Sequence, residues 1–97
     1  MYLCGQTAGG SAHANADIPA QTQEVLSRID TLLAEAGSHK SRLLTTTIYL
    51  KNMDDFAGMN AVWEAWLPPG QAPARATVQA HMASLGLLVE MTVVAAE

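Results

Sequence analysis

Leu43-Leu44-Thr45-Thr46-Thr47-Ile48-Tyr49-Leu50 is the stretch from which the fold of this chain is read most directly. β-Branched and aromatic residues dominate it, which is typical of a β-strand. Segments of helical periodicity lie on both sides of it. The stretch is therefore predicted to be a strand between two helices.

The segment before this strand carries an apolar face of helical spacing. Its members follow the pattern i, i+4, i+7, i+8 and i+11: Val25, Ile29, Leu32, Leu33 and Ala36. Asp17 can cap the start, and Pro19 is tolerated in a first turn. Gly37 occupies the position of a left-handed C-cap residue. A helix is predicted between Asp17 and Gly37.

A second helix is predicted after the turn-forming residues 52–54. Its apolar stripe has the spacing i, i+3, i+7 and i+10: Phe56, Met59, Trp63 and Trp66. The run Pro68-Pro69-Gly70 ends it, because proline cannot donate to or extend a helix. The two tryptophans are interpreted as core or interface anchors.

Three further strands complete the predicted sheet. They cover Met1 to Cys4, Ala74 to Ala80, and Leu87 to Ala95, with the last two joined near Ser84 and Gly86. The order strand, helix, strand, helix, strand, strand indicates an α+β sandwich, with two helices on one face of a mixed sheet. We expect residues 1–97 to form one domain.

Composition excludes several classes of protein. The 97 residues are 49% hydrophobic and 14% charged, which is too apolar for a disordered chain. The net charge is −4 with only 5 Lys and Arg, which argues against nucleic acid as the main partner. No apolar run is long enough for a membrane span, and the first residues do not have the pattern of a signal peptide. A cytoplasmic location is expected.

Two charged residues in the late strands are the leading candidates for a site. Glu90 lies in a strand otherwise made mostly of apolar residues, where a carboxylate is costly to bury. If the helices cover the side of Leu87 and Val89, Glu90 points to the uncovered side. Arg75 could bind a carboxylate ligand through two N–H groups, or it could line a solvated edge of the sheet. Glu90 could equally lie on a solvated face. On neighbouring strands and one face, the two would form a carboxylate-binding site with an acid/base nearby.

The histidines and the single cysteine give weaker indications of a functional site. His13, His39 and His81 lack the spacing of a metal site, so no metal is expected. Cys4 has no partner for an internal disulfide and no nearby cation in sequence. It is interpreted as a small packed residue.

Several motifs, in order along the chain, resemble the Rid family (reactive intermediate deaminases, formerly the YjgF family). They are Leu3-Cys4-Gly5-Gln6, Leu33 to Gly37, Thr47 to Leu50, Asn60-Ala61-Val62-Trp63, Pro73 to Val78, and Val89-Glu90. The resemblance implies a chorismate-mutase-like sandwich assembled as a homotrimer, with sites in the clefts between subunits. It also implies that no metal or organic cofactor is needed.

The resemblance further implies the hydrolysis of reactive enamines and imines, such as 2-aminoacrylate, to 2-oxo acids and ammonia. By this resemblance, Arg75 binds the carboxylate of a small substrate in a bidentate manner, and Glu90 positions or activates the attacking water. Thr77 contacts the ligand through its backbone N–H, and Gly5 and Asn60 line the cleft.

The chain departs from the family pattern at three points. Thr77 stands where many members have Cys, and Cys4 replaces a usual Ser. The chain also begins one strand later than family members normally do. Either the start is assigned too late, or the chain is a shortened form in which part of the pocket and an edge of the sheet are absent. These departures suggest an outlying branch.

Two other functions compete with deamination. A non-catalytic module could bind a small carboxylate metabolite in the same intersubunit cleft. A ribonuclease fits poorly with the net charge and the absence of a basic patch.

Overall fold

A mixed sheet with the strand order β1-β4-β2-β3 forms one layer of the protein. The computed structural model describes residues 2–96. The strands are β1 (Tyr2–Gln6), β2 (Leu43–Leu50), β3 (Ala74–Gln79) and β4 (Val89–Ala95). The helices are α1 (Ile18–Glu35) and α2 (Phe56–Trp66), with short 3-10 turns at Lys40–Arg42 and Met53–Asp55.

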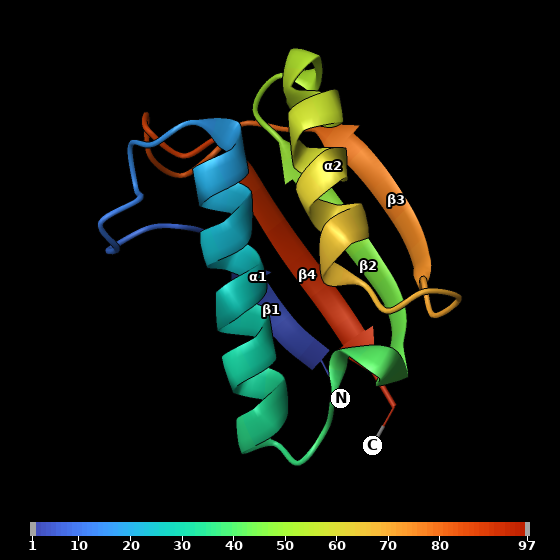
Figure 1. The fold of residues 1–97 in the computed structure, drawn as a ribbon. Coiled ribbons are helices and arrows are strands. Elements are labelled where there is room, and N and C mark those ends of the chain that lie inside the picture. Colours follow the sequence, from blue (N-terminus) through green and yellow to red (C-terminus); the bar gives the residue numbers. More distant parts are fainter. Residues whose placement is uncertain (1, 97) are drawn as a thin grey trace.

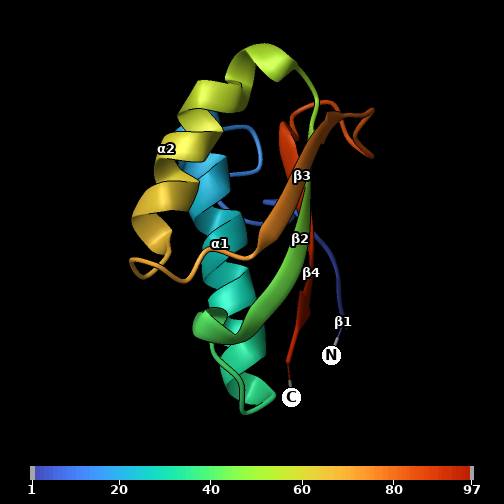
Figure 2. The same ribbon diagram turned by 90° about the vertical axis from the view of Figure 1, so that its right-hand side faces the viewer.

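Both helices pack on the same face of the sheet (Figures 1 and 2). The core between the layers takes apolar side chains from α1, α2, β2 and β4, including Val25, Ile29, Ile48, Met59 and Met91. The prediction of an α+β sandwich with two helices on one face is confirmed.

The strands do not follow one another in space as they do in sequence. β2 pairs parallel with β3, and antiparallel with β4 on its other side. The prediction that the last two strands are neighbours was therefore wrong, since β2 lies between them. The reason is that α2 crosses over the sheet and returns the chain parallel to β2 on one edge, which leaves the other edge of β2 to β4.

The caps of α1 are those expected from its sequence. Asp17 Oδ1 accepts a hydrogen bond from the backbone N–H of Ala20 at 3.1 Å. Gly37 has a φ of 76°, and the N–H of Ser38 donates to the carbonyl of Leu33 at 2.8 Å. A left-handed residue after the last turn permits this closing bond, and glycine adopts that conformation without a Cβ penalty.

Three strand boundaries differ from the prediction. β1 continues to Gln6 through an irregularity after Leu3, and its predicted start at Met1 lies outside the described residues. β3 ends at Gln79, one residue early. β4 begins at Val89 rather than Leu87. The N–H of Leu88 donates instead to the side chain of Gln21.

That side chain, which is fully buried, fastens two loops to α1. Gln21 Nε2 donates to the carbonyls of Ala16 at 2.9 Å and Gly86 at 2.7 Å, and Oε1 accepts from Leu88 N–H at 2.9 Å. The amide thus satisfies backbone groups of both loops that would otherwise be buried without partners.

Among the described residues 2–96, neither helix has the length and apolar character of a membrane-spanning segment.

We predict that Gln21→Leu lowers the free energy of unfolding by about 2–4 kcal/mol, because apolar Leu leaves those backbone groups unpaired. Urea denaturation at one fixed protein concentration measures the change. Gln23→Leu is the matched control, since Gln23 is exposed on the same helix. Equal stability of the two variants would contradict the prediction.

Candidate active site

Arg75 points from edge strand β3 toward the helix layer. It pairs in register with Thr46 of β2, and Thr46 pairs on its other side with Val93 of β4. Directly paired residues share a face of a sheet, and Val93 is buried beneath the helices. Thr46 is also buried, so this row of side chains faces the core layer.

Glu90 points to the opposite face. It lies three positions before Val93, and side chains alternate along a strand, so the odd separation reverses the direction. Val89 and Met91 are fully buried, whereas Glu90 is partly exposed and pairs with Tyr49. The prediction that Glu90 faces the uncovered side is confirmed, but Arg75 and Glu90 do not meet within this chain.

The guanidinium of Arg75 is held by three side chains of α2. Its Nη1 donates to Asn60 Oδ1 at 2.5 Å. The guanidinium carbon lies 5.5 Å from the ring centre of Phe56 and 5.7 Å from that of Trp63, within the range of cation–π attraction. The Nε and Nη2 groups make no hydrogen bond to any described residue. That edge is therefore available to a planar anion such as a carboxylate.

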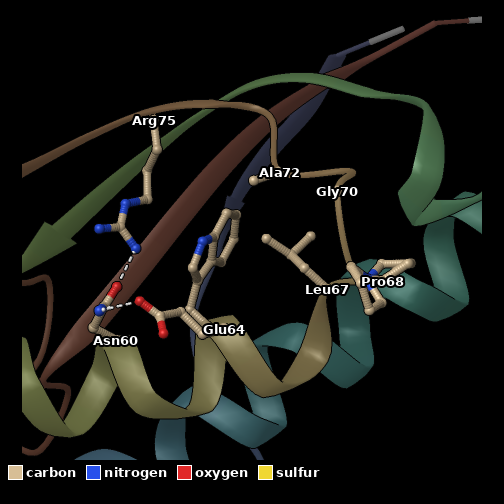
Figure 3. A pocket seen from close by; sticks show the side chains of 9 residues that line it. Asn60, Glu64, Leu67, Pro68, Gly70, Ala72 and Arg75 are labelled. Atoms are coloured by element: carbon tan, nitrogen blue, oxygen red, sulfur yellow. Dashed lines mark hydrogen bonds between the residues drawn. The ribbon is translucent and has the colours of Figure 1, made fainter.

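Asn60 is itself hydrogen-bonded to Glu64, which lies one helical turn further along α2. Asn60 Nδ2 donates to Glu64 Oε1 at 2.9 Å, and Figure 3 shows the chain of contacts from Glu64 through Asn60 to Arg75. These residues line one side of an open cavity of about 410 Å³. The other side is formed by Leu67, Ala72 and the Pro68–Gly70 turn.

Thr77 lies two positions after Arg75 and shares its face. It pairs with Ile48, and its hydroxyl oxygen is buried without a hydrogen-bond partner in the described part of the chain. Thr77 therefore shares the face of β3 from which Arg75 contacts Asn60. We call these three residues, with Phe56 and Trp63, the arginine cluster. Sequence analysis had placed Phe56 and Trp63 only on an apolar stripe and had not singled out Glu64.

Gly5 belongs with Glu90 on the other face. A Cβ atom at position 5 would lie 2.9 Å from Glu90 Cδ and 3.3 Å from its Cγ, closer than carbon atoms pack. The backbone of Gly5 does not have a positive φ, so its importance is the space it leaves rather than its conformation. We call Gly5 and Glu90 the glutamate cluster.

The remaining candidates are dispersed. Cys4 is exposed on edge strand β1, so the interpretation as a packed residue was wrong. His39 caps a 3-10 turn by accepting a hydrogen bond from the N–H of Ser41. Across residues 2–96, no three His, Cys, Asp or Glu side chains are grouped to hold a metal ion.

Comparison with known proteins adds to this geometry. The sequence model of a family described as "Endoribonuclease L-PSP" matches residues 1–97. A RutC family protein of Haemophilus ducreyi is 41% identical over 95 residues, which cover 98% of this chain and 79% of the relative. The structure of an uncharacterized Pseudomonas aeruginosa protein matches with a TM-score of 0.91 at 41% identity, covering 98% of this chain and 80% of that one. NMB1025 of Neisseria meningitidis, a member of the YjgF protein family, matches with a TM-score of 0.87 at 41% identity, over 97% of this chain and 76% of that one.

We predict that Gly5→Ala moves the carboxylate of Glu90 away from β1, because the new methyl group would overlap it. A crystal structure of the variant should show Glu90 in another rotamer with β1 still paired to β4. Cys4→Ala, at the exposed neighbouring position, should leave Glu90 in place. An unmoved Glu90, with β1 displaced instead, would contradict the prediction.

Proposed function

The chain belongs to the Rid (YjgF/RutC) family and has its chorismate-mutase-like fold, and on that basis we propose that it hydrolyses 2-imino acids and their enamine forms. The products are 2-oxo acids and ammonia. The observation that carries the proposal is the guanidinium of Arg75, fixed by Asn60 and two aromatic rings with one hydrogen-bonding edge left unpartnered.

Arg75 binds the carboxylate of the substrate in this proposal. A guanidinium presents N–H groups in a planar fork that matches the two oxygens of a carboxylate. Restraint by Asn60, Phe56 and Trp63 lowers the entropy lost when the fork engages. The substrate is thereby positioned with its C=N bond at a defined distance from the arginine.

The acid/base group must come from a second subunit. Arg75 and Glu90 lie on opposite faces of one sheet with β2 between them, so one subunit supplies either the arginine cluster or the glutamate cluster to a given site. Proteins of this family generally form trimers that bind small molecules. A ring of three subunits can bring the arginine cluster of one against the glutamate cluster of the next, because a cyclic assembly joins two different surfaces.

The uncovered face of the sheet has the composition of a surface that becomes buried. In register across the strands it carries Tyr2, Val94, Thr45 and Ala74 in one row, Thr92, Thr47 and Ala76 in the next, and Glu90, Tyr49 and Val78 in the third. Glu90 is the one charged residue among them. Burial of this face in a trimer accounts for the small share of charged residues in the chain.

The reaction then needs only a positioned water. The substrate reacts as its protonated imine: Glu90 accepts a proton from the water as the water oxygen bonds to the imine carbon, and the C=N double bond becomes the C–N single bond of a neutral carbinolamine. Collapse of this carbinolamine breaks the C–N bond, so that ammonia leaves and the 2-oxo acid forms. Glu90 returns its proton to the amino group as the C–N bond breaks, and it accepts the hydroxyl proton of the carbinolamine as the C=O bond forms.

Two other functions would give different results. A non-catalytic binding module would bind a 2-oxo acid without accelerating imine hydrolysis, and it would gain stability from that ligand by mass action. Cleavage of RNA, which the name of the family model describes, is disfavoured by the net charge of −4 and only 5 basic residues.

We predict that Arg75→Ala and Glu90→Ala each lose about 100-fold or more in kcat/KM, because each removes charge-assisted contacts. Imines generated by an amino-acid oxidase provide the substrate, and the loss of semicarbazide trapping measures their hydrolysis. Dissociating the two inactive variants and reassembling them as an equal mixture should restore about one quarter of native activity, because that share of random interfaces pairs an intact Arg75 with an intact Glu90.

Separate reassembly of each variant is the control and should restore nothing. No recovery from a mixture shown to exchange subunits would contradict a site shared between subunits. Full activity of Arg75→Ala would overturn the proposed function itself.

A further inference from the structure

The contacts of Arg75 also assign a role to a residue that does not touch it. We propose that Glu64 is a positioning residue, which orients the amide of Asn60 and through it the guanidinium that receives the substrate carboxylate. This inference rests on the proposed function. It adds a residue from the exposed side of α2 to the arginine cluster.

The argument begins with the two ends of the Asn60 amide. One end is a carbonyl oxygen that only accepts hydrogen bonds, and the other is an NH₂ group that only donates. Arg75 carries only donors, so the oxygen must face it for the 2.5 Å contact to form. With the amide turned over, two donors would face each other and Arg75 Nη1 would lose its acceptor.

Glu64 disfavours the flipped orientation of the Asn60 amide. An ionised carboxylate only accepts, so the side of Asn60 that faces Glu64 must be the NH₂ group, as the 2.9 Å bond from Nδ2 to Oε1 requires. Asn60 and Glu64 are four residues apart on α2, which places them on one face of the helix. Because the Glu64 carboxylate holds the NH₂ group of Asn60, the carbonyl oxygen of Asn60 is turned toward Arg75.

The consequence for ligand binding follows from which nitrogen is used. The bond to Asn60 occupies Nη1 and leaves Nε with Nη2, a pair of parallel donors suited to a carboxylate. In Figure 3 the terminal nitrogen of Arg75 that is not bonded to Asn60 points away from Leu67 and Ala72. Loss of the acceptor at Nη1 would let the guanidinium rotate and misdirect this edge.

The test is a double-mutant cycle between Glu64 and Asn60. Glu64→Gln keeps the size of the side chain but can donate as well as accept, so it no longer selects one amide orientation. We expect KM for a 2-imino acid, and the Kd of the product analogue 2-oxobutanoate measured by calorimetry, to rise about fivefold, the value of one net hydrogen bond. The kcat should change by less than about twofold, since the lost interaction acts on binding of the carboxylate throughout the reaction.

Asn60→Ala should show a similar loss of binding, and Glu64→Gln should add nothing in that background, because its action passes through Asn60. Glu35→Gln, which removes an exposed carboxylate from the last turn of α1, is the control for charge and should bind normally. Glu64→Asp, which keeps an acceptor, should recover part of the lost affinity.

Three results would overturn the inference. Glu64→Gln could bind 2-oxobutanoate with native affinity, or it could weaken binding in the Asn60→Ala background as much as it does in the native protein. The third is a native protein that binds no 2-oxo acid. A native protein that binds 2-oxobutanoate but hydrolyses no imine would overturn the proposed hydrolysis alone. The cycle of Kd values would then still decide the role of Glu64.

Discussion

Pairing of β2 with a strand on each side is the constraint on which the rest of the structure depends. β3 lies parallel on one side and β4 antiparallel on the other, and the registers place Thr46 level with both Arg75 and Val93. Because side chains alternate, these pairings decide which residues meet the helices and which meet the open face. A slip of one residue in either register would exchange the faces of Arg75 or Glu90.

This arrangement separates the candidate chemistry into two halves. The arginine cluster depends on α2, which supplies Asn60, Phe56 and Trp63 at helical spacing beneath the guanidinium. The glutamate cluster depends on β1, where the absence of a side chain at Gly5 leaves room for Glu90. Both halves are present in the single chain that the structure describes. Neither contains both a carboxylate receptor and an acid/base, so assembly and activity are coupled in the function we propose.

Two polar side chains of α1, Gln21 and Arg28, connect that helix to loops. Gln21 joins α1 to the loop that precedes this helix and to the loop that precedes β4. Arg28 donates to the carbonyls of Thr7 and Gly9 and pairs with Glu24. Hydrogen bonds from Arg28 therefore fasten the long loop that follows β1 to α1. Such connections leave little trace in hydrophobic periodicity, because a polar residue on a helix is usually exposed.

The sequence by itself determined the helices, the strands and their layer arrangement. Periodicity, Asp17 and Gly37 as caps, and the run Pro68-Pro69-Gly70 act over a few residues and are visible along the chain. The alternation that turns Glu90 to the open face was equally local. Only the tertiary structure decided that β2 separates β3 from β4, that Arg75 faces Asn60 rather than Glu90, and that Glu64 stands behind Asn60. These depend on strand order and on which side chains meet across elements, and residue spacing in one chain does not specify such contacts.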